Sequence, residues 1–208
     1  MNARRSGYAI AVVAVVVVGV LGALYLLKAP PFGEDTGDIE AGAVCDSLGP
    51  GPRAAGALRT VLPEKSSYAF DDDVNLRVDE RDSGYGSDCF VSGGGDQLLR
   101  ARTQMVRDEP FESWADGEVA QYADGKGRLT PFTTGLKGTA SPSVAAVLVP
   151  CTSAGKIPGG QYDLSVVVHL EKAGKASDAG TRAGLIELAK NAAAYAHDKA
   201  KCDIALPA

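Results

Sequence analysis

The chain reads YDLSVVVHL at residues 162–170 and TRAGLIELAKNAAAYAHDKAK at residues 181–201. Every second side chain from Tyr162 to Leu170 is apolar, which is the period of a β-strand with one buried face. The second stretch has apolar side chains every three or four residues, namely Leu185, Leu188, Ala192 and Tyr195. That spacing predicts an amphipathic α-helix, with Asp178 or Thr181 as its N-cap.

Two cysteines connect this helix to the rest of the chain. Cys202 continues the apolar stripe of the helix, and Cys151 follows the apolar run at residues 144–149, which we interpret as a central strand. A Cys151–Cys202 disulfide is therefore expected and, by elimination, a Cys45–Cys89 disulfide, although four cysteines allow three pairings. The gaps between successive cysteines are 44, 62 and 51 residues, so the close pairs of a zinc site are missing.

The remaining segments complete the predicted fold. Helical spacing occurs at residues 53–62 and, less clearly, at 111–122. Strand-like alternation occurs at residues 74–79 and 99–107, and further strands are expected from residue 89 and at 128–132. We therefore predict an α+β fold over residues 45–208, with an antiparallel sheet and helices packed on one side.

The N-terminal region predicts a membrane anchor. Residues 8–27 carry no charge, and 20 residues of helix span about 30 Å, the thickness of a bilayer's hydrocarbon core. Arg4 and Arg5 precede this run, so the positive-inside rule places residues 1–7 in the cytoplasm. We expect a transmembrane helix at residues 8–28, an acidic Pro/Gly linker at 29–44 and an extracytoplasmic domain at 45–208. A cleaved signal peptide is the alternative, but its apolar region would be only about 7–15 residues long.

Charge and cysteine content limit the partners. Beyond Lys28 the chain has 26 acidic and 18 basic side chains, since Arg4, Arg5 and Lys28 account for the other three. Phosphate backbones attract basic surfaces, so nucleic acid is not an expected partner. An even number of cysteines, all beyond the anchor, is typical of an oxidising compartment. Within the anchor, Gly19 and Ala23 form a small-x-x-x-small pair, a hypothesis for weak self-association.

No catalytic, metal-binding or cofactor-binding residue is predicted. Asp163, Ser165 and His169 share one strand face, but Ser165 and His169 would be about 13 Å apart, whereas a nucleophile and its base need about 3 Å. Consecutive Asp71, Asp72 and Asp73 do not have the alternating spacing of a calcium loop, so a solvated turn is expected there. Gly93–Gly95 lacks the Lys-Ser/Thr of a phosphate loop and predicts a hairpin turn.

The strand predicted at residues 99–107 carries several arginines. Arg100, Arg102 and Arg107 could form a binding stripe on one face. We expect instead a solvated sheet face on which these arginines pair with nearby acidic side chains.

The motif Ala145–Cys151 (AAVLVPC), followed by a Val-rich strand and an Ala-rich helix ending in Lys201-Cys202, resembles anchored or secreted proteins of high-GC actinobacteria. The stretch from Cys45-Asp46-Ser47-Leu48 to Cys89 is similar to the first cysteine pair of actinobacterial cell-envelope lipoproteins. This resemblance implies a location in the cell envelope and no particular activity.

The function predicted from these observations is non-enzymatic binding of an envelope partner or a small ligand. One alternative is a hydrolase acting on cell-wall material through a carboxylate-based site. Another is a sensor or accessory subunit that signals through the transmembrane helices of a partner.

Overall fold

The computed structural model describes residue 19, residues 36–123 and residues 127–206. Except for Gly19, the anchor predicted at residues 8–28 lies outside the described residues, and so do Ala23 of the small-residue pair and residues 29–35 of the predicted linker. Within the described ranges, no helix combines the length and the apolar character needed to cross a membrane.

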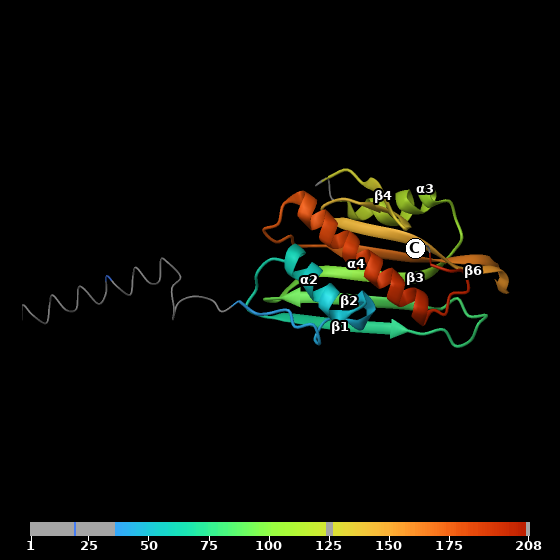
Figure 1. The fold of residues 1–208 in the computed structure, drawn as a ribbon, viewed down its shortest axis with the longest axis horizontal. Helices are drawn as coiled ribbons and strands as arrows, with labels where there is room; N and C mark the ends of the chain where they lie inside the picture. Colours follow the sequence, from blue (N-terminus) through green and yellow to red (C-terminus); the bar gives the residue numbers. More distant parts are fainter. Residues whose placement is uncertain (1–18, 20–35, 124–126, 207–208) are drawn as a thin grey trace, which may run out of the picture. The chain divides into compact units, whose positions relative to one another are not determined.

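The domain is built on one antiparallel sheet of seven strands in the order β1-β2-β3-β7-β6-β5-β4 (Figure 1). The strands are β1 (Tyr68–Asn75), β2 (Gly86–Gly93), β3 (Asp96–Arg107), β4 (Thr130–Thr134), β5 (Leu136–Ala140), β6 (Val144–Ile157) and β7 (Gly160–Leu170). Helices α2 (Gly51–Val61) and α4 (Asp178–Lys199) cross one face of the sheet, preceded by the short turn η1 (Asp46–Leu48). The predicted α+β class and antiparallel sheet are confirmed.

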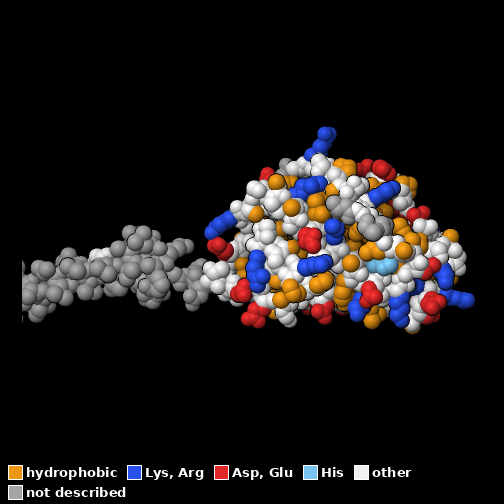
Figure 2. Space-filling view, in the orientation of Figure 1, with side chains coloured by type: hydrophobic (Ala, Val, Ile, Leu, Met, Phe, Trp, Pro, Cys, Tyr) orange, Lys and Arg blue, Asp and Glu red, His pale blue; other side chains and the backbone are white. Residues whose placement is uncertain are grey.

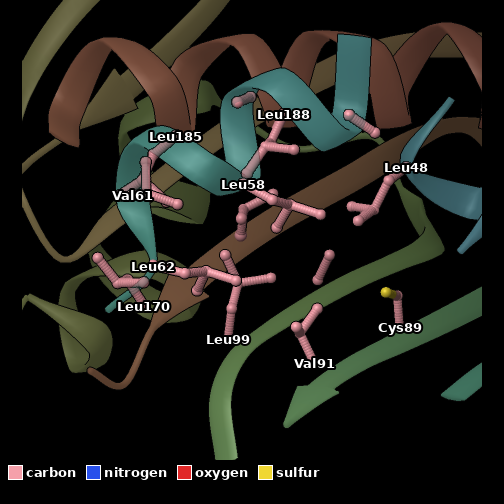
Figure 3. Close-up of a cluster of buried hydrophobic side chains, with 14 of the residues drawn as sticks. Leu48, Leu58, Val61, Leu62, Cys89, Val91, Leu99, Leu170, Leu185 and Leu188 are labelled. Atoms are coloured by element: carbon pink, nitrogen blue, oxygen red, sulfur yellow. The ribbon is translucent and has the colours of Figure 1, made fainter. Parts of the chain in front are cut away.

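The main core lies between this face of the sheet and the two helices. Leu58 and Val61 of α2 meet Leu185 and Leu188 of α4 above Leu99 of β3, and all five are fully buried (Figure 3). Leu185, Leu188 and Ala192 of the predicted apolar stripe thus belong to the packing face of the last helix, whereas Tyr195 is only half-buried. Its N-cap is Ser177, whose hydroxyl accepts a hydrogen bond from Gly180 N at 3.2 Å, and not Asp178 or Thr181.

Both disulfides have the predicted pairing. Cys45 is bonded to Cys89 in β2, and Cys151 in β6 is bonded to Cys202 just beyond α4, with Cα–Cα distances of 6.1 and 4.4 Å. The backbone N–H groups of Asp203 and Ile204 also donate to the carbonyl of Cys151. The end of the last helix is therefore held to the centre of the sheet.

The prediction that helices pack on one side holds only for α2 and α4. The segment Phe111–Tyr122, made of α3 (Phe111–Trp114), η2 (Ala115–Val119) and η3 (Ala120–Tyr122), packs on the opposite face. Its buried Trp114 and Val119 lie against β6 and β7. The reason is in β6, where every residue from Val144 to Val149 is buried, so both faces of this strand need cover.

The strand predicted at residues 74–79 is wrong. Strand β1 ends at Asn75, and the side chains of Leu76 and Val78 are 54% and 90% exposed. A loop held by polar contacts follows, in which the Asp82 carboxylate accepts from the backbone N–H groups of Val78 and Gly84 at 2.8 Å each. Asp71–Asp73, predicted to form a turn, are instead part of β1, which is an edge strand.

Acidic and basic side chains are interspersed on the face that α2 and α4 cover (Figure 2). Neither sign gathers there into the kind of field that would steer a charged partner. The features that suggest a site lie on the opposite face of the sheet.

Candidate functional site

The face of the sheet opposite α2 and α4 is called the second face below. The side chains that point to it include those of Arg100, Arg102 and Gln104 of β3 and of Asp163, Ser165, Val167 and His169 of β7. Residues 111–122, called the covering segment, lie on it. Trp114 anchors this segment, because its indole Nε1 donates a buried hydrogen bond of 2.9 Å to the hydroxyl of Ser165. The covering segment has a hollow on each side.

On the β3 side is a polar groove lined by Arg100, Arg102, Gln104, Glu118, Tyr122, Ser165, Val167 and His169. The ring of Tyr122 lies 4.9 Å from that of His169, whose Nδ1 is 3.2 Å from the carboxylate of Glu171. The free volume of the groove is only about 20 Å³, which is close to the space one water molecule needs. The groove therefore has no room for a ligand unless side chains move.

The lining of the groove also shows how Ser165 and His169 are arranged. Both side chains line it, as their shared strand face predicts, but they are two alternate positions apart on β7. The hydroxyl of Ser165 is held by Trp114 and not by the imidazole. Asp163 lies outside the groove, so the three residues do not form a triad.

The arginines of β3 separate by face. Arg100 donates to Asp88 of β2 from Nε and Nη2 at 2.9 and 2.7 Å and lies 4.9 Å from the ring centroid of Phe90. This pairing with an acidic neighbour confirms the predicted solvated face for Arg100. Arg102 is exposed on the same face, whereas Arg107, an odd number of positions away, is on the other face.

On the β6 side of the covering segment is a larger hollow of about 310 Å³. We call it the Asp163 pocket; its lining consists of Glu109, Phe111, Gly135, Leu136, Lys137, Leu148, Pro150 and Asp163. Apolar side chains form most of the wall, and Glu109, Lys137 and Asp163 are its charged side chains. A concave, mostly apolar hollow with a few placed polar groups is the common form of a small-molecule site.

Asp163 is the unusual residue of this pocket. Its side chain is 4% exposed, and its Oδ1 is buried without a hydrogen-bond partner among the described residues. Burial is the largest of the causes that together raise the pKa of Asp163 to about 6; the negative charge and the side chain of Asp108 add to the shift, and the side chain of Gln161 opposes it. The charge of Glu109 acts in the same direction as that of Asp108.

The backbone explains how an acidic side chain comes to lie here. Asp163 pairs with Pro150 of β6, which has no N–H group, and the register of the β6–β7 pair shifts between Pro150 and Thr152. The covering segment then encloses this part of the second face. A position that alternation assigns to the solvent side is thereby buried.

The other candidate sites are not assembled. Across the described ranges, no three His, Cys, Asp or Glu side chains lie close enough to hold a metal ion. Asp72 accepts hydrogen bonds from the N–H and hydroxyl of Ser47, on the helix-covered side of β1, whereas Asp71 and Asp73 alternate to the second face. Gly94 and Gly95, with φ of 59° and 83°, form the predicted hairpin turn between β2 and β3.

Sequence reasoning considered Asp163 only as a member of a triad, and it missed the pocket. The signal that was available is the continuous apolar run at residues 144–149. A strand buried on both faces requires that its neighbour β7 be partly covered on both faces too. Comparison with known proteins adds no template: no protein-family model, no curated protein and no solved structure matches this chain.

Proposed function

We propose that the domain lies outside the cytoplasm and binds a small, mostly apolar ligand in the Asp163 pocket. The observation that carries this proposal is the pocket of about 310 Å³ with a buried carboxyl oxygen that has no partner in the described chain. A buried polar atom without a hydrogen bond is unfavourable by about 1–3 kcal/mol, and a ligand with a donor group would remove that penalty.

The proposed location is supported by the two disulfides, which form and persist in oxidising compartments. The apolar run at residues 8–27 would anchor the chain, and the acidic linker would hold the domain above the outer surface of the membrane. In this arrangement the ligand is a component of the cell envelope or a solute that passes through it.

Binding without catalysis is favoured by the state of the polar side chains on the second face. Ser165, the serine that shares a strand face with a histidine, donates no hydrogen bond to that histidine and is held by Trp114. His169 lies in the tight groove, on the other side of the covering segment from the pocket.

One observation favours a carboxylate-based hydrolase as the second candidate. Asp163 has a pKa of about 6, and Asp108 and Glu109 lie close enough for their charges to affect it. A carboxyl group with a raised pKa in an apolar pocket is suited to act as a general acid, and a nearby carboxylate can serve as base or nucleophile.

A ligand screen on the purified full-length chain separates the two candidates. Peptides, sugars and amphiphiles from cell envelopes are added, and unfolding is followed by the emission of Trp114, the only tryptophan of the chain. A ligand of the pocket raises the unfolding midpoint of the wild type and not that of Leu148→Phe, whose larger ring would project into the pocket and obstruct it. Leu76→Phe, at an exposed loop position, is the control.

If every stabilising compound acts equally on wild type and Leu148→Phe, the pocket is not the binding site. Consumption of a compound by the wild type, abolished in Asp163→Asn, would replace the binding function with the hydrolase.

A further inference from the structure

Two opposite charges flank the Asp163 pocket. Asp163 is on β7 and Lys137 is on β5, with β6 between them, and both side chains line the pocket. Neighbouring strands are about 4.8 Å apart, and the register offsets Lys137 from Asp163 by about two residues along the strands, so their backbones are roughly 12 Å apart. The side chain of Lys137 is long and flexible enough for its ammonium group to cover part of this distance.

The two charges are not paired with each other or with described neighbours. No ion pair within 4 Å involves Asp163 or Lys137 among the residues that the structure describes. The acidic end is buried and has two further acids beside it, Asp108 and Glu109. The basic end is exposed, on a short strand near the rim. One end of the pocket therefore favours a cation and the other an anion.

The middle of the pocket is apolar. Leu148 and Pro150 of β6 lie between the two charged positions, and the ring of Phe111 from the covering segment adds to the wall. The volume of about 310 Å³ is at the low end of small-molecule sites. Long lipids and oligosaccharides do not fit in such a space as a whole.

We infer that the pocket takes a zwitterion with an apolar middle, a short apolar peptide, whose ammonium group meets Asp163 and whose carboxylate meets Lys137. This inference rests on the proposed function and names its ligand class. Two or three extended residues span about 7–11 Å, which is close to the separation of roughly 12 Å between the backbones of Asp163 and Lys137. An ammonium group has three N–H donors for the unpartnered carboxyl oxygen, whereas a ligand carboxylate at that end would meet three acids.

The test uses the dipeptide Leu-Leu and two blocked forms, binding to the full-length chain being measured by calorimetry. N-acetylation removes the ammonium group, and C-terminal amidation removes the carboxylate. Free Leu-Leu should bind more tightly than the acetylated form by about tenfold or more, because a buried charge-assisted hydrogen bond is lost. Amidation should weaken binding less, because Lys137 is exposed.

Variants assign each end of the peptide to its residue. In Asp163→Asn the difference between free and acetylated peptide should disappear, and in Lys137→Ala the difference between free and amidated peptide should disappear. Asp73→Asn and Lys156→Ala, which change charge at exposed positions away from the pocket, should retain both differences. An unchanged emission maximum of Trp114 shows that each variant is folded.

Two outcomes overturn the inference in distinguishable ways. If blocked and free peptides bind equally, or if only compounds of another class bind and Leu148→Phe prevents that binding, the ligand class is wrong and the binding function stands. If neither the peptides nor any compound of the screen binds in a way that Leu148→Phe prevents, the proposed function fails as well.

Discussion

Asp163 combines a pKa of about 6 with a side chain that is only 4% exposed, and this makes the stability of the domain depend on pH. The folded state binds the proton more tightly than the unfolded state, in which the pKa is near the ordinary value of 3.8. The resulting stabilisation is complete below pH 4 and is lost as the pH rises through 6.

Replacing Asp163 by Asn should remove this pH dependence. Relative to the variant, the wild type should lose up to about 3 kcal/mol of unfolding free energy between pH 4 and pH 7, given the shift from 3.8 to about 6. Urea unfolding at both pH values measures the difference, and the other carboxylates, Asp108 and Glu109 included, are common to both proteins. A constant difference between the two proteins at all pH values would show that Asp163 has an ordinary pKa.

The hydrogen bond between Trp114 and Ser165 gives a second prediction. Ser165→Ala leaves the buried indole N–H without its acceptor, which should lower the unfolding free energy by about 1–3 kcal/mol. Ser153→Ala, whose hydroxyl bonds to the exposed Asp203, should have a smaller effect. Urea midpoints from tryptophan emission give both values; equal effects would mean that the covering segment does not depend on this bond.

Two elements, α2 and α4, approach each other closely where α4 has a glycine. A Cβ atom at Gly184 would lie 2.6 Å from Cγ1 of the fully buried Val61, so the helices approach at this point because no side chain separates them. Gly56 on α2 has no neighbour within 4 Å of its Cβ position.

The same substitution should therefore have opposite effects at the two glycines. Gly184→Ala should destabilise by about 1–3 kcal/mol through overpacking, despite the better helix propensity of alanine. Gly56→Ala should stabilise by about 0.5–1 kcal/mol, because only the propensity changes. Thermal and urea unfolding of the two variants check both signs, and stabilisation by Gly184→Ala would show that the helices can separate without loss.

The two ends of α4 are held by different interactions, a disulfide near the C-terminal end and a side-chain cap at the N-terminal end. Removing the Cys151–Cys202 disulfide by a double Ser substitution opens a loop closed over 51 residues, worth about 4 kcal/mol in the chain-entropy model. Ser177→Ala removes the N-cap and should have a smaller effect, about 1 kcal/mol. Hydrogen exchange should show the last turns of α4 opening in the first variant and only the first turn in the second. A larger loss of stability in Ser177→Ala than in the variant without the disulfide would contradict this prediction.

The elements that could be predicted from the sequence are those in which the spacing of the apolar residues matches the side of the element that is buried. The alternation from Tyr162 to Leu170 gave a strand, and the spacing of Leu185 and Leu188 gave the packing face of α4. Residues 74–79 alternate equally well, but Asp82 and Arg77 close a polar loop there. The spacing of apolar residues along the chain does not reveal contacts with carbonyl groups far away in the sequence. One such contact is the hydrogen bond that Arg77 donates to the carbonyl of Ala200.

The candidate pocket was not predictable in the same way. Its walls come from Phe111, Leu136, Leu148 and Asp163, which are far apart in the sequence and belong to four different elements or their ends. Only the sheet order, in which β7 lies between β3 and β6, brings them to one place. The two disulfides were predictable because Cys151 follows a buried run and the spacing of the α4 stripe leads toward Cys202, although α4 itself ends at Lys199.

At the scale of the whole chain, the disulfides and the apolar N-terminal run predict an anchored extracytoplasmic domain. Protease added to intact spheroplasts of an expressing bacterium should degrade residues 45–208, because they would lie outside. A cytoplasmic protein that resists protease until lysis is the control. Protection of the domain, or its release without residues 1–28, would contradict the anchored arrangement.

The two edge strands of the sheet determine whether crowded copies of the domain can pair their sheets. Strand β1 forms one end and has exposed Asp71, Asp72 and Asp73 in its middle; β4 forms the other and contains Pro131, which has no N–H group. A neighbouring chain that added a strand at β1 would place its backbone beside three negative charges, and at β4 it would lose a hydrogen bond. Copies of the domain held close together on one surface can therefore collide without joining their sheets into fibrils.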